Sequence, residues 1–181
     1  MCIRDRIKNL ETGELLDDEL EGLFYGATWA GEDYLFYVRC DDAWRPHQIW
    51  RHKLGTPAAE DVLVYEETDE KFGVGVGADR AERFLMIIAS SSLTSEYRVL
   101  DLTNPTGEFE VLWEREAGIK YHPNFCIVDG EEHWVVTHNA HGANFCVATT
   151  PVGDVPPLRE LPVLVEHLSL IHISEPTRRR G

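Results

Sequence analysis

The chain is poor in the features that mark several large classes of protein. It has 181 residues and only four cysteines, none in a CxxC pair. That is too few for a disulfide scaffold, so a reducing, cytoplasmic compartment is expected, with export left open. No run of about 18 apolar residues occurs, so no helix is expected to cross a membrane. Lys and Arg number 17 against 32 Asp and Glu, giving a net charge of −15. This balance argues against binding nucleic acid or an anionic membrane, because both require positive charge.

The two ends of the chain do not follow the pattern of the middle. Residues 1–6 can be encoded by ATG TGT ATA AGA GAC AG, and the reverse complement of that string translates as residues 168–172. Such ends are typical of transposase-type sequencing adapters rather than of protein motifs. We therefore expect residues 1–6 and 168–181 to be adapter-derived and exclude them from fold reasoning, as for any cloning scar. The domain is expected to span residues 7–167, within a parent protein that continues in both directions.

The middle of the chain repeats at an interval of about 48 residues. Leu15-Leu16, Leu63-Val64 and Val111-Leu112 follow one another at steps of 48, and Val163-Leu164 comes after 52 more. Each interval holds four short runs rich in β-branched and aromatic residues, separated by turn signals. The expected strands are 24–30, 34–39, 48–54 and 61–66, then 72–77, 84–89, 97–102 and 109–114, then 125–128, 133–137, 145–150 and 161–166.

Four strands every 40–50 residues are the spacing of a β-propeller blade. A β-sandwich also has short strands and frequent turns, but the recurrence favours the propeller. We therefore predict an all-β fold: a partial β-propeller of about three four-stranded antiparallel blades plus the end of another. That end is residues 15–23, an acidic stretch that could also pass for a short helix. A closed propeller has 4–8 blades, so this chain cannot close a ring.

Two stretches resemble catalytic or phosphate-binding motifs but lack the context that these need. Ser90–Ser92 follow an expected strand without the glycines of a G-x-S-x-G nucleophile elbow, a string that does not occur in this sequence. A solvated loop is the favoured interpretation. Gly73–Gly77 alternates glycine with valine, but a strand and not a helix follows it. We interpret it as the innermost strand of a blade, where glycine allows close backbone approach.

Three further groups of histidine, cysteine and acidic residues could bind a metal, act in catalysis or attract a peptide. Residue types suitable for zinc occur in the third of these repeats, at Cys126, His138, His141 and Cys146. Their spacing is not the usual close-paired one, and a free cysteine often behaves as a small buried hydrophobe. His47 and His52 bracket one strand, which favours cross-strand packing over a catalytic base. The acidic run Glu66–Glu70 is expected in a loop between blades, either simply solvated or attracting basic peptides. We assign no catalytic, cofactor-binding or metal-binding residue.

The stretch 45–56 is distinctive, and it continues through 61–67 and 72–77 with supporting matches at 94–101 and 143–145. Together these resemble the prolyl oligopeptidase family of serine peptidases, most of all its oligopeptidase B branch. The resemblance covers everything except the two adapter-like ends. It implies a seven-bladed propeller that caps an α/β-hydrolase domain, where the catalytic Ser, Asp and His lie. None of the family's catalytic motifs occurs here, so no catalytic residue is carried over.

The resemblance also implies a function. The chain would be the propeller portion that filters substrates by size in an enzyme cleaving short peptides after Arg or Lys. It would need no cofactor, have the hydrolase domain of the same parent as its partner, and be inactive alone. A stand-alone propeller that binds proteins or peptides is the alternative, because propellers host many functions. A glycosidase or lactonase with a channel site would need carboxylates or a metal cage on inner strands, which here are apolar or glycine-rich.

Overall fold

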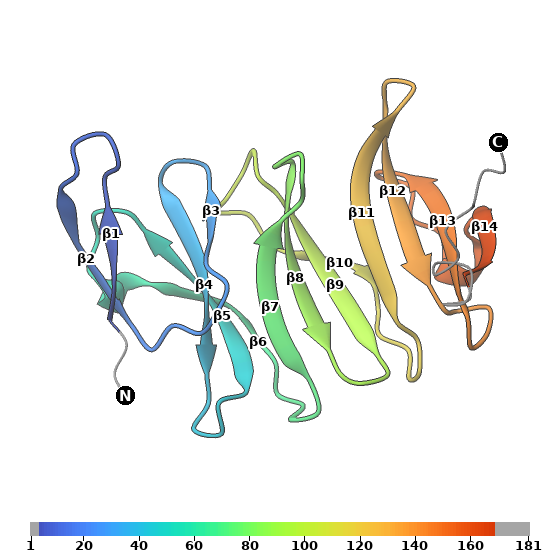
Figure 1. Ribbon diagram of the computed structural model, residues 1–181, viewed down its shortest axis with the longest axis horizontal. Helices are drawn as coiled ribbons and strands as arrows, with labels where there is room; N and C mark the ends of the chain where they lie inside the picture. Colours follow the sequence, from blue (N-terminus) through green and yellow to red (C-terminus); the bar gives the residue numbers. More distant parts are fainter. Residues whose placement is uncertain (1–3, 169–181) are drawn as a thin grey trace, which may run out of the picture. The chain divides into compact units, whose positions relative to one another are not determined.

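The computed structural model describes residues 4–168, which form antiparallel β-strands joined by turns and two short 3-10 helices (Figure 1). The described strands make one hairpin and three four-stranded sheets, each keeping its strands in chain order. The hairpin is β1 (Arg4–Lys8) and β2 (Leu15–Glu21). The sheets are β3 (Thr28–Ala30), β4 (Tyr34–Cys40), β5 (Pro46–Lys53) and β6 (Val62–Glu66); β7 (Gly73–Ala78), β8 (Phe84–Ser90), β9 (Ser95–Asp101) and β10 (Glu110–Trp113); and β11 (Tyr121–Val128), β12 (Glu131–His138), β13 (Phe145–Pro151) and β14 (Val163–Leu168). The 3-10 helices η1 (Ala58–Glu60) and η2 (Leu158–Glu160) precede β6 and β14.

This arrangement confirms the predicted fold class. Each expected strand is present, and the repeated apolar pairs lie in β2, β6, β10 and β14, the last strand of each sheet. Residues 15–21 are a strand and not a helix. In addition, residues 4–8 form a strand that pairs with β2, so part of the segment expected to be adapter-derived lies in this hairpin.

Two inner strands differ from the prediction. β3 begins later than expected because Gly26 adopts a φ of 98°, which interrupts the extended backbone. β11 begins earlier than expected and includes Pro123. A proline lacks the N–H that a central strand must donate, but β11 pairs only with β12 and so tolerates it.

Contacts divide the chain into two compact units. The first contains the described residues up to 92, together with 97–112. It therefore holds the hairpin, the sheet β3–β6 and most of the sheet β7–β10. The second contains residues 93–96 and the described residues from 113 onward, and therefore holds the sheet β11–β14.

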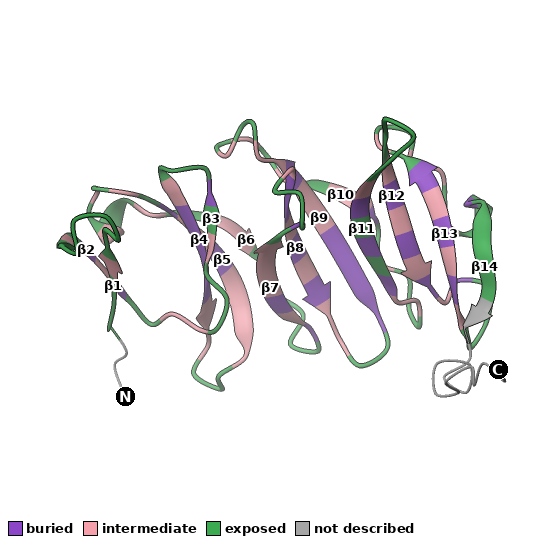
Figure 2. Ribbon diagram, turned by 45° about the horizontal axis from the view of Figure 1, so that its top comes forward, coloured by how far each residue is buried: buried purple, intermediate pink, exposed green. Residues whose placement is uncertain are grey.

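The core of the first unit is built by both faces of β4. Phe36 and Val38 belong to a buried cluster shared with β7, β8 and β9. Leu35 and Tyr37 belong to another, shared with Leu20 of the hairpin. Because successive residues of a strand point to opposite faces, one strand can supply two cores. Figure 2 shows buried residues concentrated in the middle strands of the sheets.

The second unit has its core along β12. Trp134 and Val136 are 1% and 0% exposed, and Phe125 of β11 meets Trp134 edge-on at 6.0 Å between ring centroids. The alternation of buried and partly exposed residues along β12 is the period-two pattern of a strand that packs on one face.

The direction of the strands decides where the loops gather. Neighbouring strands are antiparallel, so the first and third loops of each sheet lie at one end of its strands. The second loop and the linker to the next sheet lie at the other end. The polar groups described below lie at both of these ends.

Candidate functional site

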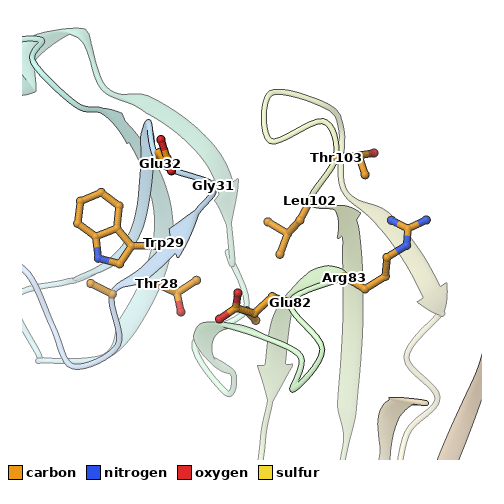
Figure 3. Close-up of a pocket in the computed structure, with 10 residues that line it drawn as sticks. Thr28, Trp29, Gly31, Glu32, Glu82, Arg83, Leu102 and Thr103 are labelled. Carbon is orange, nitrogen blue, oxygen red and sulfur yellow. The ribbon is translucent and has the colours of Figure 1, made fainter. Parts of the chain in front are cut away.

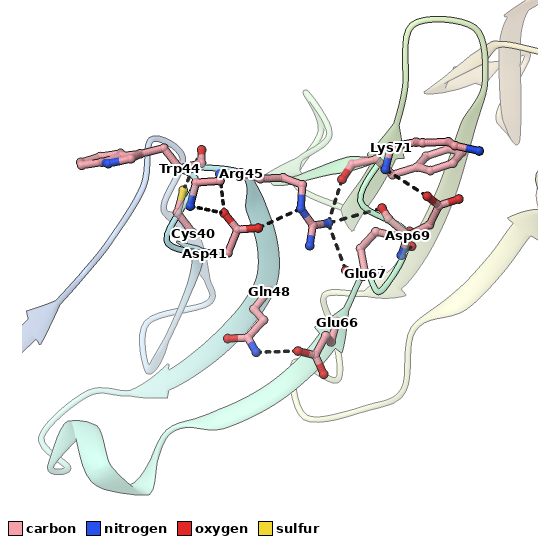
Figure 4. Close-up of polar contacts among 11 residues, drawn as sticks. Cys40, Asp41, Trp44, Arg45, Gln48, Glu66, Glu67, Asp69 and Lys71 are labelled. Carbon is pink, nitrogen blue, oxygen red and sulfur yellow. Dashed lines mark hydrogen bonds and ion pairs between the residues drawn. The ribbon is translucent and has the colours of Figure 1, made fainter.

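At the linker end of the first sheet, an arginine holds the chain that leaves the sheet (Figure 4). Arg45, in the β4–β5 loop, donates hydrogen bonds to the carbonyl oxygens of Glu67 and Phe72 at 3.2 and 3.1 Å. Its Nε donates to the carboxylate of Asp41 at 3.0 Å. The backbone N–H and side chain of Arg45, with the backbone N–H of Ala43, hold the pKa of Asp41 below its usual value. We call the contact between Arg45 and residues 67–72 the first linker clasp.

The acidic run is part of this clasp. Glu67 is 4% exposed and accepts hydrogen bonds from the Tyr65 hydroxyl and the Asp69 backbone N–H, both at 2.9 Å. Glu66 accepts a hydrogen bond from the Gln48 side chain at 2.8 Å. The run is therefore a hydrogen-bonded turn with a structural carboxylate at its centre. Its attraction for basic peptides stays a prediction.

A similar arrangement occurs within the second unit. Ser95, at the start of β9, donates from its hydroxyl to the Tyr121 carbonyl and accepts the Tyr121 N–H, both at 2.9 Å. The carboxylate of Glu96 accepts a hydrogen bond from Arg115 Nε at 3.3 Å. These residues hold the linker between β10 and β11, and we call this contact the second linker clasp. Neither clasp could be derived from the sequence, because its partners do not share a local motif.

A buried polar cluster lies where the hairpin meets the first sheet. His52 of β5 is 0% exposed, with Nε2 2.9 Å from Oδ1 of Asp18 in β2 and Nδ1 2.7 Å from Oδ1 of Asp61. The Tyr37 hydroxyl donates to Oδ2 of Asp61 at 2.7 Å. The Gly55 N–H donates to Asp18 at 2.6 Å. We call these five residues the His52 cluster; it joins the hairpin to the sheet.

The electrostatics of this cluster follow from burial and hydrogen bonding. Burial alone raises the pKa of Asp18, but hydrogen bonds from His52 and Gly55 outweigh it and leave the pKa below its usual value. Burial and the hydrogen bond to Asp61 raise the pKa of the Tyr37 phenol. A histidine between carboxylates can serve as a base, but a ring with no exposed surface cannot reach a substrate. The geometry therefore favours a structural role for His52.

Within the described part of the chain, Nδ1 of His47, on the same strand, differs from the ring nitrogens of His52. The His47 nitrogen is buried and has no hydrogen-bond partner within residues 4–168. Both histidines lie in β5, but they differ in the hydrogen-bond partners of their ring nitrogens. The carboxylate partners of His52 were missed because they lie 34 and 9 residues away along the chain.

His138, His141 and Cys146 come together in the second unit, with potential ligand atoms within 4.8 Å of one another. Cys126 is not with them: it lies opposite His133 in the β11–β12 register, whereas Cys146 lies opposite His138. The structure therefore gathers three of the four residues considered for zinc.

Hydrogen bonds already use the atoms that zinc would need. Nδ1 of His138 accepts the Ala140 backbone N–H at 3.2 Å, which leaves the proton of the neutral ring on Nε2. The Cys146 thiol donates to the His138 carbonyl at 3.5 Å. Burial raises the pKa of Cys146, whereas zinc requires a thiolate. The geometry favours a buried hydrogen-bonded pair, and our assignment of no metal ligand stays a prediction.

The serine and glycine motifs lie in ordinary sheet elements. Ser90 ends β8, and the next two serines lie in the β8–β9 connection. Gly73–Gly77 lies in β7, the first strand of its sheet. A Cβ added to Gly73 would lie 3.4 Å from Cγ of Pro46, and one added to Gly75 would lie 3.4 Å from Cγ2 of Ile88. The Gly73 distance, to a residue of the neighbouring sheet, fits the close-approach interpretation. Ile88 pairs with Gly75 in the same sheet, and a Cβ added to Gly77 would meet nothing within 4 Å, so for these two glycines the interpretation stays a prediction.

An open pocket of about 650 Å³ lies between the first two sheets, at the end opposite the linker. Its polar lining comes from β3 and three loops (Figure 3): Thr28, Glu32, Glu82, Arg83 and Thr103. Arg83 is ion-paired with Asp101, which holds the pKa of that carboxyl well below its usual value. Figure 3 shows Trp29 on the opposite side of β3 from Thr28, so the indole does not face Glu82. Two exposed glutamates alone do not define a ligand, and we assign none.

No helix in the described part of the chain is long and apolar enough to cross a membrane.

Comparison with known proteins gives consistent matches. The sequence profile of the prolyl oligopeptidase N-terminal beta-propeller domain matches residues 4–176. "Protease 2" of Moraxella lacunata is 33% identical over 156 residues, covering 82% of this chain and 21% of that protein. "Dipeptidyl aminopeptidase BI" of Pseudoxanthomonas mexicana is 38% identical over 152 residues, covering 82% of this chain and 20% of that protein.

Solved structures of oligopeptidase B match the fold. The Trypanosoma brucei enzyme matches with a TM-score of 0.76 and 29% identity, over 84% of this chain and 21% of that one. The Leishmania major enzyme matches with a TM-score of 0.77 and 29% identity, over 88% of this chain and 22% of that one. The chain spans about a fifth of the length of the curated relatives it matches. The profile match and the shared four-stranded sheets confirm the family expected from the sequence: the chain belongs to the N-terminal β-propeller domain of the prolyl oligopeptidase family, in its oligopeptidase B branch.

Proposed function

We propose that this chain is the gating part of a serine oligopeptidase that cleaves short peptides after Arg or Lys. The observation that carries the proposal is the match of sequence and fold to the propeller of oligopeptidase B. A ring of blades selects by size, because only small or flexible peptides can pass it. The net charge of −15 would favour the approach of basic peptides.

The chemistry would come from the α/β-hydrolase domain of the same parent chain, which would also be the propeller's partner. Acyl transfer requires a nucleophile, a base oriented on it and an oxyanion hole. Within residues 4–168 we identify no such set, since His52 is enclosed and Ser90–Ser92 lie at a strand end. The chain alone is therefore expected to be inactive.

Location and boundaries belong to the same proposal. Cys40, Cys126 and Cys146 are free thiols, which suits the reducing cytoplasm. We retain residues 7–167 as the propeller segment and residues 1–6 and 168–181 as adapter-derived. The DNA from which the sequence was read tests this division.

The first experiment is long-read sequencing of the source DNA across both ends of residues 7–167. We expect a reading frame that leads into a hydrolase domain with G-x-S-x-G and a later histidine. The encoded enzyme should cleave Arg and Lys peptides, and deleting its propeller should extend cleavage to larger proteins. A frame that closes a ring and stops would instead identify a binding propeller without catalytic function.

A further inference from the structure

The His52 cluster holds more hydrogen-bond acceptors than a neutral histidine can satisfy. A neutral imidazole has one N–H and one bare nitrogen, whereas an ionised carboxylate only accepts hydrogen bonds. Here both ring nitrogens face carboxylate oxygens, at 2.9 Å for Asp18 and 2.7 Å for Asp61. A neutral ring with no exposed surface would point one bare nitrogen at an oxygen lone pair. The cluster therefore needs one additional proton.

The other contacts place that proton on the histidine. Oδ1 of Asp18 also accepts the Gly55 N–H at 2.6 Å, and Oδ2 of Asp61 accepts the Tyr37 hydroxyl at 2.7 Å. Both carboxylates thus receive a second hydrogen bond, which favours their ionised forms. Burial raises the pKa of Asp18, but the hydrogen bonds with His52 and Gly55 outweigh burial and hold that pKa below its usual value.

We propose that His52 is held as an imidazolium between Asp18 and Asp61, and that loss of its proton releases β2 from the first sheet. The cluster would then be a latch that weakens as pH rises. Asp18 is the hairpin's buried polar contact to this ring, while Asp61 and Tyr37 belong to the sheet side. This inference is independent of the proposed peptidase function.

The surrounding charges are consistent with a protonated ring. From the sheet, the guanidinium of Arg39 lies 5.3 Å from the Tyr37 ring centroid and 4.6 Å from that of Trp50. From the hairpin, Asp17 lines the same open groove as Asp18. The ring thus has two carboxylates in direct contact, while this arginine stacks on neighbouring aromatic rings.

The sign of the pH effect follows from counting protons. A free histidine releases its proton near pH 6.5, so above that pH the folded chain would hold one proton more than the unfolded chain. Stability then falls as pH rises, until folded His52 also loses its proton. One proton of difference raises the unfolding equilibrium constant up to about tenfold per pH unit.

Asp61→Asn is the discriminating variant. Its amide nitrogen would take the place of Oδ1 and donate to Nδ1 of His52, while its oxygen would still accept the Tyr37 hydroxyl. A neutral ring then satisfies every contact, with its Nε2–H donating to Asp18. The variant should keep the hairpin docked and lose the fall in stability between pH 7 and pH 9. His47→Leu, on the same strand, is the matched control and should keep the fall.

The experiment uses the whole 181-residue chain. NMR of the histidine ring nitrogens at pH 7.5 should show two N–H groups for His52, whereas a single ring N–H would overturn the proposal without any variant. Urea unfolding and amide-exchange protection of β2 are then measured from pH 7 to pH 9. A pH slope lost in Asp61→Asn and kept in His47→Leu supports the latch. An unchanged slope in Asp61→Asn refutes it.

Discussion

Replacing Arg45 tests whether the first linker clasp stabilises the fold. Arg45→Met keeps most of the aliphatic length but removes the guanidinium. The variant loses the hydrogen bonds to the Glu67 and Phe72 carbonyls and the ion pair with Asp41. Hydrogen bonds that involve a charged group contribute about 1.5–3 kcal/mol each, and an ion pair near the surface about 0.2–1 kcal/mol.

The expected loss is smaller than the sum of the upper values. Asp41 has a side-chain exposure of 29%, and the linker lies in a surface turn, so water can replace part of what is lost. We therefore expect Arg45→Met to lower the free energy of unfolding by about 2–4 kcal/mol. Arg45→Lys should recover only part of this, because an ammonium group cannot span the same carbonyls and Asp41 together.

The assay is urea unfolding at pH 7, followed by tryptophan fluorescence. The dependence of the unfolding free energy on urea concentration is compared between wild type and variant, to check that both unfold in the same transition. Arg80→Met is the control, since Arg80 is an exposed arginine in the turn between β7 and β8. A loss below about 1 kcal/mol for Arg45→Met, or an equal loss for Arg80→Met, would refute the importance of the clasp.

Three further predictions concern single polar side chains. Asp101→Asn removes the ion pair with Arg83, which lowers the pKa of Asp101. Wild type and variant should therefore converge in stability as pH falls below about 4. A constant difference in stability from pH 7 to pH 3 would contradict this. Burial, His141 and Arg159 lower the pKa of His138, so wild type should lose stability as pH falls from 7 to 5, and His138→Asn should flatten that profile in urea unfolding. Tyr121→Phe removes the hydroxyl that donates to the Trp113 carbonyl at 2.6 Å, and it should cost about 1–2 kcal/mol in thermal or urea unfolding; no measurable loss would show that the hydrogen bond is dispensable.

The sequence predicts the sheets well because their signals are local. Apolar alternation, turn residues and the 48-residue interval are all readable within one strand or one repeat. The two errors at inner strands have local causes too: Gly26 interrupts β3, and Pro123 is tolerated because β11 is unpaired on one side in its sheet. A pattern of residues cannot distinguish an edge strand from a central one before the sheet order is known.

The polar clusters could not be predicted in the same way. Their partners come from different strands, and nothing in the composition near His52 points to Asp18. The stretch 45–56 was recognisable as distinctive, and the structure gives a reason: Arg45, His52 and Gly55 all make long-range contacts. These residues contact the linker to the next sheet and Asp18 of the hairpin.

The linker clasps have a consequence for the order in which the chain can fold. Arg45 is 22 and 27 residues from its carbonyl partners, and Ser95 is 26 from Tyr121. In each case the clasping residue precedes the linker and belongs to the sheet just completed. During synthesis, a sheet can therefore fix its outgoing linker before most of the next sheet exists, and the short loops involved close quickly. The repeat would then be assembled from the N-terminal side, one sheet at a time.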